Sequence, residues 1–380
     1  MVAKRTNGRI AHESLGEQGP SDEGTMRLLF FTNTPAHVHL FRNAVAELGS
    51  RGHDVRILAR QDECSTALLE WYDLPFEQYG RLDSGLAWLG TQLPRHLGRI
   101  FRAARRFDPD LIFGIGPYAA FAGVVTRTPS ILVLDSEPTL DHVLPRPFVR
   151  AILTPEAFRK DLGRKQFVFR GFKECAYLHP DVYCPQGAVR EALGLEDGES
   201  FALVRLNSFV GHHDIGRRGF DRDHRRELIA TLAEEATVFV SDEEGTLDFD
   251  SLPAEPYSLH PALIHDALAE AELLVADTQT MVTEAALLGT PAIRSNSFVG
   301  EGDMGNFLEL ERAGLIFNSR EFDEVVDRAR TLLQRDGVQE TWAEKRSDYL
   351  ADKVNLTELL LDVMENADDL ERVVGLSTRR

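Results

Sequence analysis

Short runs of apolar residues alternate with helical segments along this chain, and this alternation constrains the fold more than any other feature. Residues 28–31, 55–59, 111–113 and 131–134 are mostly apolar runs of strand length, and apolar residues at helical spacing follow the first of them. Strands that are apolar on both faces and alternate with helices form parallel sheets covered by helices. The first part of the chain is therefore predicted to be a doubly wound α/β domain.

The same pattern starts again in the second half of the chain. Further strand-length runs, separated by helical segments, lie at residues 201–206, 238–240, 273–276, 292–294 and 315–317. Residues 160–200 contain several glycines and prolines, which favour a hinge between two such domains. The expected organisation is a disordered N-terminal arm at 1–24, domains at 25–185 and 186–350, and a C-terminal helix or tail at 351–380. Two such domains are expected to face each other across a cleft. Parallel α/β sheets bind ligands beyond the carboxyl ends of their strands, so function is expected in the loops there.

Composition narrows the possible partners. The chain has 61 acidic against 42 basic residues, a formal net charge of −19, and such a surface repels polyanions, which argues against nucleic acid as a partner. Only six of the basic residues are Lys. An acidic excess with few Lys is typical of proteins from salt-loving microbes, where salt screens like charges, and predicts a halophilic archaeal source. A mesophilic source with high-GC coding is the alternative.

Cysteine usage and the absence of signal patterns predict a cytoplasmic protein. Cys64, Cys175 and Cys184 have no CxxC spacing, which favours a reducing compartment and no cysteine metal site. The N-terminus has no charged-then-apolar signal pattern. The longest uncharged apolar stretch, 111–126, is interrupted by glycine and proline and is shorter than the roughly 20 residues that span a bilayer.

The loop at 277–291 follows a buried strand and leads into a helix. The first turn of such a helix offers free backbone N–H groups to an anion, and the hydroxyls of Thr278 and Thr280 stand beside it. Glu284 lies about one turn further, where a carboxylate can accept hydrogen bonds from ribose hydroxyls. The alternative is an ordinary helix start capped by Asp277 or Thr278.

The loop at 32–39 carries two histidines one residue apart at a strand-to-helix turn. His37 and His39 cannot share one helical face, so one of them is expected to face the cleft. A histidine there can act as a general base near neutral pH. The alternative is a structural histidine at the helix start that bonds a loop carbonyl.

A second group of polar residues follows the strand at 201–206. Arg205 at its end can hold a phosphate through two hydrogen bonds, the alternative being a salt bridge within an acidic protein. His213 and Asp214 are expected at the cleft. Together with His212 they make a weak metal site, because adjacent histidines rarely bind one ion and no further ligands stand at suitable spacing.

The segment 84–107 contrasts with the overall charge. It has no acidic residue, and Arg95, Arg99, Arg102 and Arg106 recur at helical spacing beside apolar residues. Such a basic amphipathic helix can lie on an anionic membrane surface, near a polyprenyl-phosphate-linked acceptor. The favoured alternative is a helix packed on the core, since Pro94 and Gly98 are expected to interrupt a continuous interfacial helix.

The 277–291 loop resembles the diphosphate- and ribose-binding loop of GT-B nucleotide-sugar proteins. There a strand enters a turn of small residues, then a helix with a Glu, then Gly-x-Pro. It is also similar to the motif of the UDP-N-acetylglucosamine 2-epimerases, with Gln279 and Thr280 in place of two glycines. The resemblance implies a GT-B fold, two Rossmann-like doubly wound domains facing a cleft. It also implies that Thr278, Gln279 and Thr280 hold the diphosphate and Glu284 the ribose.

The first half resembles the glycosyltransferase that completes lipid II. His37 matches the histidine of its first glycine loop, Gly116 belongs to a match of its second, and Glu137 lies where it carries a Glu-Gln turn. Asn33 and Thr34 precede the histidine and, with Gly116, are expected to bind substrate.

Residues 26–345 are also similar, in motif order, to an uncharacterised archaeal and bacterial GT-B-like family known as a domain of unknown function. The shared motifs lie at 32–39, 51–53, 171–174, 177–180, 205, 213–214 and 277–291. The resemblance supports the same fold and implies no reaction.

These patterns together predict a metal-independent glycosyltransferase that uses a nucleoside-diphosphate sugar and needs no cofactor. His37 would deprotonate the acceptor hydroxyl of a glycan or lipid-linked acceptor, at the cytoplasmic face of the membrane if the acceptor is lipid-linked. Helix amides at 278–280 and Arg205 would stabilise the leaving diphosphate. One alternative is a sugar 2-epimerase whose acid and base come from Glu137, His213 and Asp214. The other is a nucleotide-sugar-binding protein without catalysis.

Overall fold

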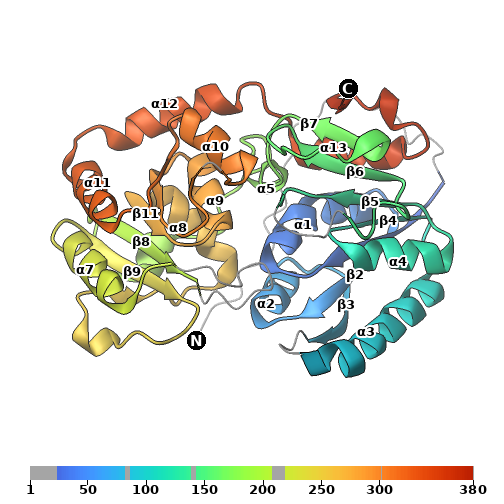
Figure 1. Cartoon of the computed structure of the whole chain (residues 1–380), viewed down its shortest axis with the longest axis horizontal. Helices are drawn as coiled ribbons and strands as arrows, with labels where there is room; N and C mark the ends of the chain where they lie inside the picture. Colours follow the sequence, from blue (N-terminus) through green and yellow to red (C-terminus); the bar gives the residue numbers. More distant parts are fainter. Residues whose placement is uncertain (1–23, 82–85, 138–142, 208–218, 301, 380) are drawn as a thin grey trace.

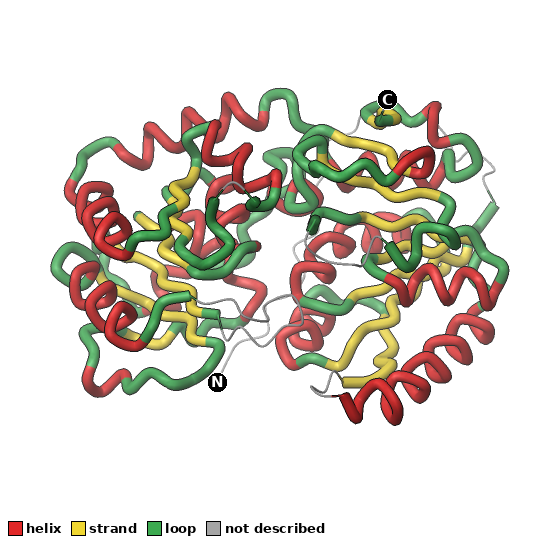
Figure 2. The backbone as a smooth tube through the Cα atoms, viewed as in Figure 1, coloured by secondary structure: helices red, strands yellow, loops and turns green. Residues whose placement is uncertain are grey.

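A computed structural model describes residues 24–81, 86–137, 143–207, 219–300 and 302–379 of the chain. Two α/β domains lie next to each other, each built on its own sheet (Figure 1). Figure 2 shows the strands of each sheet lying between helices, as expected for strands that are apolar on both faces.

The first sheet has eight strands among the described residues. From one edge to the other they are β14 (Leu376–Thr378), β7 (Gln166–Phe169), β6 (Ala151–Pro155), β5 (Ser130–Val133), β4 (Leu111–Gly114), β1 (Arg27–Thr32), β2 (Asp54–Gln61) and β3 (Phe76–Arg81). Neighbouring strands pair in parallel, except for β14, which runs antiparallel to β7.

Helices cover both faces of the first sheet. Leu28 and Phe30 of β1 belong to one core cluster, with apolar residues of α1 (Pro35–Ser50) and α2 (Glu63–Trp71). The residues between and beside them, Leu29 and Phe31, belong to a second cluster on the opposite face. Its helices are α3 (Leu86–Phe107) and α4 (Pro117–Thr126). Successive side chains of a strand point to opposite faces, so the continuous apolar run of β1 fills both layers.

The second sheet has six parallel strands among the described residues. Their order is β10 (Glu255–Pro256), β9 (Thr237–Asp242), β8 (Phe201–Leu206), β11 (Leu273–Ala276), β12 (Ala292–Arg294) and β13 (Ile316–Asn318). The helices of this half are α6 (Val189–Leu193), α7 (Arg222–Leu232), α8 (Ile264–Glu270), α9 (Thr280–Leu288), α10 (Gly305–Arg312), α11 (Phe322–Gln334) and α12 (Val338–Leu350). Single 3₁₀ turns lie at Gly163–Lys165, Phe249–Ser251, Pro261–Leu263 and Leu370–Arg372.

The chain returns to the first domain at its end. After α12, helix α13 (Leu356–Glu365) packs against α1 and α5 (Cys175–Leu178), and β14 extends the first sheet. Thr357 Oγ1 donates to the carbonyl of Ala176 at 2.6 Å. The segment 351–380, expected as a C-terminal helix or tail, therefore supplies both a helix and an edge strand to the first sheet (Figure 1).

One local expectation is narrowed and another was wrong. Within the predicted hinge at 160–200, Gln166–Phe169 forms β7 and pairs with β6, so these residues belong to the first sheet. The helix at 84–107 is not interrupted at Pro94: α3 runs from Leu86 to Phe107 with the proline inside it. A proline there loses one backbone hydrogen bond, and burial of Ile100 and Phe107 in the core favours the helix nonetheless. This burial supports the core-packed alternative for the helix.

Candidate functional site

A hollow of about 620 Å³ lies where the strands of the two sheets end. The second sheet contributes the residues that follow β8, β9, β11 and β12, and the first domain contributes the start of α1. Both sheets therefore present the carboxyl ends of their strands to this space, which we call the large hollow. Ligands of parallel α/β sheets bind at this place.

Most of the predicted site residues reach the large hollow. It is lined by seven of them: Thr34, His37, Arg205, Thr278, Gln279, Thr280 and Glu284. Glu137 lines a different hollow, described below. Asn33 and Gly116 are not in either lining, and His213 and Asp214 lie outside the described residues.

The start of α9 has the features of an anion site. Its N-cap residue, Gln279, makes no side-chain cap bond, and its carbonyl accepts from the backbone N–H of Val282 at 3.2 Å. The backbone N–H groups of Thr280 and Met281, which precede Val282 in the first turn, have no hydrogen-bond partner among the described residues. The buried Thr278 Oγ1 has no hydrogen-bond partner among the described residues. The alternative of a helix capped by Asp277 or Thr278 is wrong, because the N-cap residue is Gln279 and no side chain caps the helix. Asp277 Oδ1 instead accepts from the backbone N–H of Asn207 at 2.7 Å.

Asp277 is a buried carboxyl at the end of β11. It is 1% exposed, and its other oxygen, Oδ2, has no partner among the described residues. Burial raises the pKa of Asp277 to about 7, against the opposing effects of the Asn207 amide and Arg225. A carboxyl that holds its proton near neutral pH can donate a hydrogen bond to an anionic ligand.

Glu284, the predicted ribose ligand, contacts one residue of each domain. Its Oε1 accepts a hydrogen bond of 2.8 Å from Tyr177 Oη and lies 3.1 Å from His265 Nε2. Tyr177 lies in α5 of the first domain, whereas His265 lies in α8 of the second. Burial works to raise the pKa of Glu284, but His265 and these hydrogen bonds outweigh it and the pKa lies below its ordinary value.

His37 presents a proton rather than a lone pair. Its Nδ1 accepts from the backbone N–H of Asn33 at 3.1 Å, so in the neutral ring the proton sits on Nε2. Burial lowers the pKa of His37 to about 3, and the nearby charges of Lys173 and Arg60 add to the shift. In this arrangement His37 is a neutral hydrogen-bond donor at pH 7.

His39 also lines the large hollow, so the expectation that only one of the two histidines faces the cleft was wrong. Its Nδ1 lies 3.1 Å from Arg42 Nη1, and its ring centroid lies 4.5 Å from that of His265. Burial, followed by the charges of His265 and Arg42, lowers the pKa of His39 well below its ordinary value. The cleft face of α1 therefore carries two neutral imidazoles.

Lys173 and its partners form a buried charged cluster at the same hollow. Lys173 Nζ contacts Asp135 Oδ2 and lies 3.2 Å from Glu174 Oε1. Burial lowers the pKa of Lys173, but these two carboxylates outweigh it and raise the pKa overall. Burial raises the pKa of Glu174 to about 7. Sequence reasoning assigned Lys173 no chemistry; its signal was a Lys–Glu pair after an apolar strand.

Arg205 pairs within its own domain. Its guanidinium contacts Glu243 Oε1 and donates to Ser241 Oγ at 2.5 Å, while the residue also lines the large hollow. The salt-bridge alternative is therefore present in this structure. A phosphate bound by Arg205 would share the Arg205 guanidinium with Glu243.

Asn33 and Gly116 lie in loops of the first domain and line neither hollow. Asn33 Oδ1 accepts from Tyr79 Oη at 2.6 Å, and its Nδ2 donates to the carbonyl of Ile115 at 3.4 Å. Gly116 has a φ of 80°, which favours glycine, and precedes α4. Asn33, a predicted substrate-binding residue, therefore has structural hydrogen bonds, and Gly116 provides the backbone conformation that α4 needs at its start.

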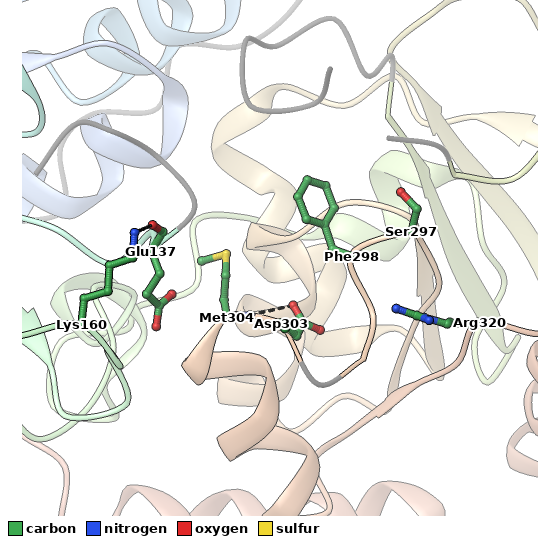
Figure 3. Close-up of a pocket in the computed structure, with 8 residues that line it drawn as sticks. Glu137, Lys160, Ser297, Phe298, Asp303, Met304 and Arg320 are labelled. Atoms are coloured by element: carbon green, nitrogen blue, oxygen red, sulfur yellow. Dashed lines mark hydrogen bonds between the residues drawn. The ribbon is translucent and has the colours of Figure 1, made fainter. Parts of the chain in front are cut away.

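A second hollow, of about 330 Å³, lies between the domains; we call it the small hollow (Figure 3). Glu137 and Lys160 come from the first domain, and Asp303, Met304 and Arg320 from the second. Glu137 follows β5, and Phe298 lines both hollows.

Glu137 joins the two domains. Its Oε1 accepts from the backbone N–H groups of Arg159 at 3.0 Å and Gly305 at 3.1 Å. Gly305 is the first residue of α10, so a carboxylate of one domain bonds the helix N-terminus of the other, where the helix dipole favours negative charge.

The described residues lack two features, a metal-binding cluster and a membrane-spanning helix. They contain no group of three or more His, Cys, Asp or Glu side chains placed to hold a metal ion. No helix within them has the length and apolar character needed to cross a membrane.

Two parallel-sheet α/β domains with a hollow at their strand ends define a GT-B fold. No family model matches the chain, and no curated protein matches its sequence. Solved structures match over nearly their whole length. A UDP-N-acetylglucosamine 2-epimerase is 12% identical, with a TM-score of 0.65 over 94% of this chain and 100% of that one.

Two other structures are similar. MnaA of S. aureus, solved with UDP, is 10% identical, with a TM-score of 0.63 over 91% of this chain and 98% of that one. The spinosyn forosaminyltransferase SpnP is 14% identical, with a TM-score of 0.61 over 91% and 99%. At these identities the comparisons establish the predicted fold.

Proposed function

We propose that this protein is an enzyme that binds a nucleoside-diphosphate sugar in the large hollow. The observation that carries the proposal is the start of α9, where the backbone N–H groups of Thr280 and Met281 and the Thr278 hydroxyl have no partner among the described residues, and all three residues line the large hollow. The solved structures of the same fold support it, since one was solved with UDP, one is named as a UDP-N-acetylglucosamine 2-epimerase and one as a forosaminyltransferase.

The proposed reaction is transfer of the sugar to an acceptor hydroxyl. When the bond between sugar and diphosphate breaks, negative charge grows on the diphosphate, and the α9 amides with Thr278 and Thr280 would stabilise it. His37 was expected as the general base. With its proton on Nε2 it would instead donate a hydrogen bond to a substrate oxygen.

A specific observation favours epimerisation as the second candidate. Glu137 is a buried carboxylate at the end of β5 beside the cleft, and an acid or base is what proton exchange at a sugar carbon requires. The other predicted members of that pair, His213 and Asp214, lie outside the described residues.

The finer parts of the proposal concern the acceptor and the setting. We propose an acceptor that is linked to a lipid at the cytoplasmic membrane face, and a reaction that needs no metal ion. We also propose that the chain is a member of the uncharacterised GT-B-like family and comes from a halophilic source. Vesicle sedimentation with anionic lipids tests the membrane part. Activity in a chelator tests independence from metal ions.

The deciding experiment has two stages. A thermal-shift screen with UDP, GDP, ADP and CDP first tests nucleotide binding, since a ligand of the folded state raises the melting temperature. Nucleotide sugars that carry the base of the nucleotide found to bind are then incubated with the protein, with and without glycan acceptors. Diphosphate release only with acceptor supports transfer, and a changed sugar without acceptor supports epimerisation. Binding with neither reaction supports a non-catalytic protein, and no nucleotide binding overturns the proposal.

A further inference from the structure

The small hollow has an acceptor oxygen without a partner. Glu137 is 8% exposed, and while its Oε1 takes two backbone hydrogen bonds, its Oε2 has no partner among the described residues. A buried carboxylate oxygen without a hydrogen bond is costly. Since Glu137 lines the small hollow, a ligand there can supply the missing donor.

We propose that the small hollow binds a neutral, hydroxyl-rich ligand about the size of a monosaccharide, and that Glu137 Oε2 accepts a hydrogen bond from one of its hydroxyls. The ligand would be the acceptor end of the transfer reaction. This identification rests on the proposed function, whereas the binding itself does not.

The charges around the small hollow select this ligand class. Glu137 and Asp303 on its walls repel an anion such as a phosphate, and Lys160 and Arg320 repel a cation (Figure 3). A sugar carries no charge, and its hydroxyls both donate and accept hydrogen bonds, so it suits a wall with charges of both signs. The Phe298 ring offers an apolar surface beside them.

Position and size agree with an acceptor. A volume of about 330 Å³ falls at the lower end of small-molecule sites. Phe298 lines both hollows, so a ligand in the small hollow would lie next to one in the large hollow. Because the walls come from both domains, this hollow exists only when the domains are in contact.

Glu137→Gln separates the binding role from the structural one. The amide oxygen can still accept from Arg159 and Gly305, whereas an NH₂ group replaces Oε2 and changes an acceptor into a donor. The matched control is Glu77→Gln, at a carboxylate that pairs with Arg106 on α3.

Ligand-observed NMR with methyl α-D-glucopyranoside, methyl α-D-mannopyranoside and methyl N-acetyl-β-D-glucosaminide measures the binding. We expect at least one to bind the unmodified protein and the Glu77→Gln variant equally, and its affinity to fall about tenfold in Glu137→Gln. No binding of any glycoside to the unmodified protein, or equal binding to Glu137→Gln, overturns the proposal.

A second variant tests the small hollow independently, in case Glu137→Gln does not fold. A Cβ atom added at Gly302 meets no atom within 4 Å, so Gly302→Phe can fill the small hollow without a clash at the backbone. It should abolish glycoside binding, and retained binding would count against this site. UDP thermal shifts of the same samples keep the two proposals apart. Glycoside binding without UDP binding refutes only the donor site, and the reverse refutes only this inference.

Discussion

The two hollows of the cleft differ in the kind of hydrogen-bonding group that they leave without a partner. In the large hollow the charged side chains are paired, Lys173 with Asp135 and Arg205 with Glu243. What remains there among the described residues are mainly donors: the amides of Thr280 and Met281 and the hydroxyl of Thr278. Asp277 Oδ2 also has no partner, but it belongs to a carboxyl whose pKa burial raises to about 7. In the small hollow, the acceptor Glu137 Oε2 has no hydrogen-bond partner among the described residues.

This difference indicates what each hollow can bind. A diphosphate has only acceptors and suits a wall of donors, whereas a sugar hydroxyl can donate to a carboxylate. In a chain of net charge −19, the large hollow does not depend on excess basic side chains to attract an anion. Backbone amides and the Asp277 carboxyl, whose pKa burial raises to about 7, can do so locally, which is why overall charge says little about this site.

The largest expected effect comes from disrupting the contact between the two domains beside the small hollow. A Cβ atom at Gly305 would lie 1.7 Å from the carbonyl oxygen of Ala157, so Gly305→Ala must displace α10 from the first domain. We expect a loss of about 1–3 kcal/mol in the free energy of unfolding, measured in urea, and loss of glycoside binding. Gly302→Ala, which meets no atom within 4 Å, is the control and should unfold like the parent.

The second prediction removes a donor from the large hollow. Thr278→Val keeps the shape of the side chain but deletes the unpartnered hydroxyl, and UDP affinity measured by calorimetry should fall about tenfold. Thr283 also has a buried, unpartnered hydroxyl, yet it does not line the hollow. Thr283→Val should leave UDP affinity unchanged, and an equal loss in both variants would contradict the assignment.

The third prediction uses pH to change a donor into an acceptor. The folded-state pKa of Asp277 is about 7, raised from 3.8, so its proton is lost between pH 6 and 8. The negative carboxylate would repel a diphosphate, and UDP affinity should fall about fivefold from pH 7 to 8. The same shift makes the protein lose stability as pH rises from 3.8 to about 7, since the unfolded chain releases this proton first.

Asp277→Asn provides the comparison for this titration. The amide keeps an acceptor for the Asn207 N–H and cannot ionise, so UDP affinity should vary less with pH than in the parent. Identical pH dependence in both proteins would show that another group titrates.

Local patterns predicted the fold and part of the site, and distant contacts were missed. The apolar run of β1 and the loop before α9 are continuous in sequence, so strand and helix start were both predictable. In contrast, β3 contains Glu77 and Gln78 and gave no strand signal. The Tyr177–Glu284 hydrogen bond joins residues 107 apart, which only the docking of two domains brings together. The tautomer of His37 depends on one backbone N–H, which no residue pattern specifies.

The smallest expected effect concerns His37, and it decides between donor and base. A general base with a pKa near 6.5 would make kcat/KM fall as pH drops from 7 to 5, because the protonated ring cannot accept a proton. With a pKa of about 3, His37 stays neutral over this range. The acid side of the profile should therefore be the same in the parent and in His37→Gln, which retains an N–H donor, even if the overall rate differs. An acid limb near pH 6.5 in the parent that disappears in His37→Gln would restore the base role, because only a titrating ring can produce it.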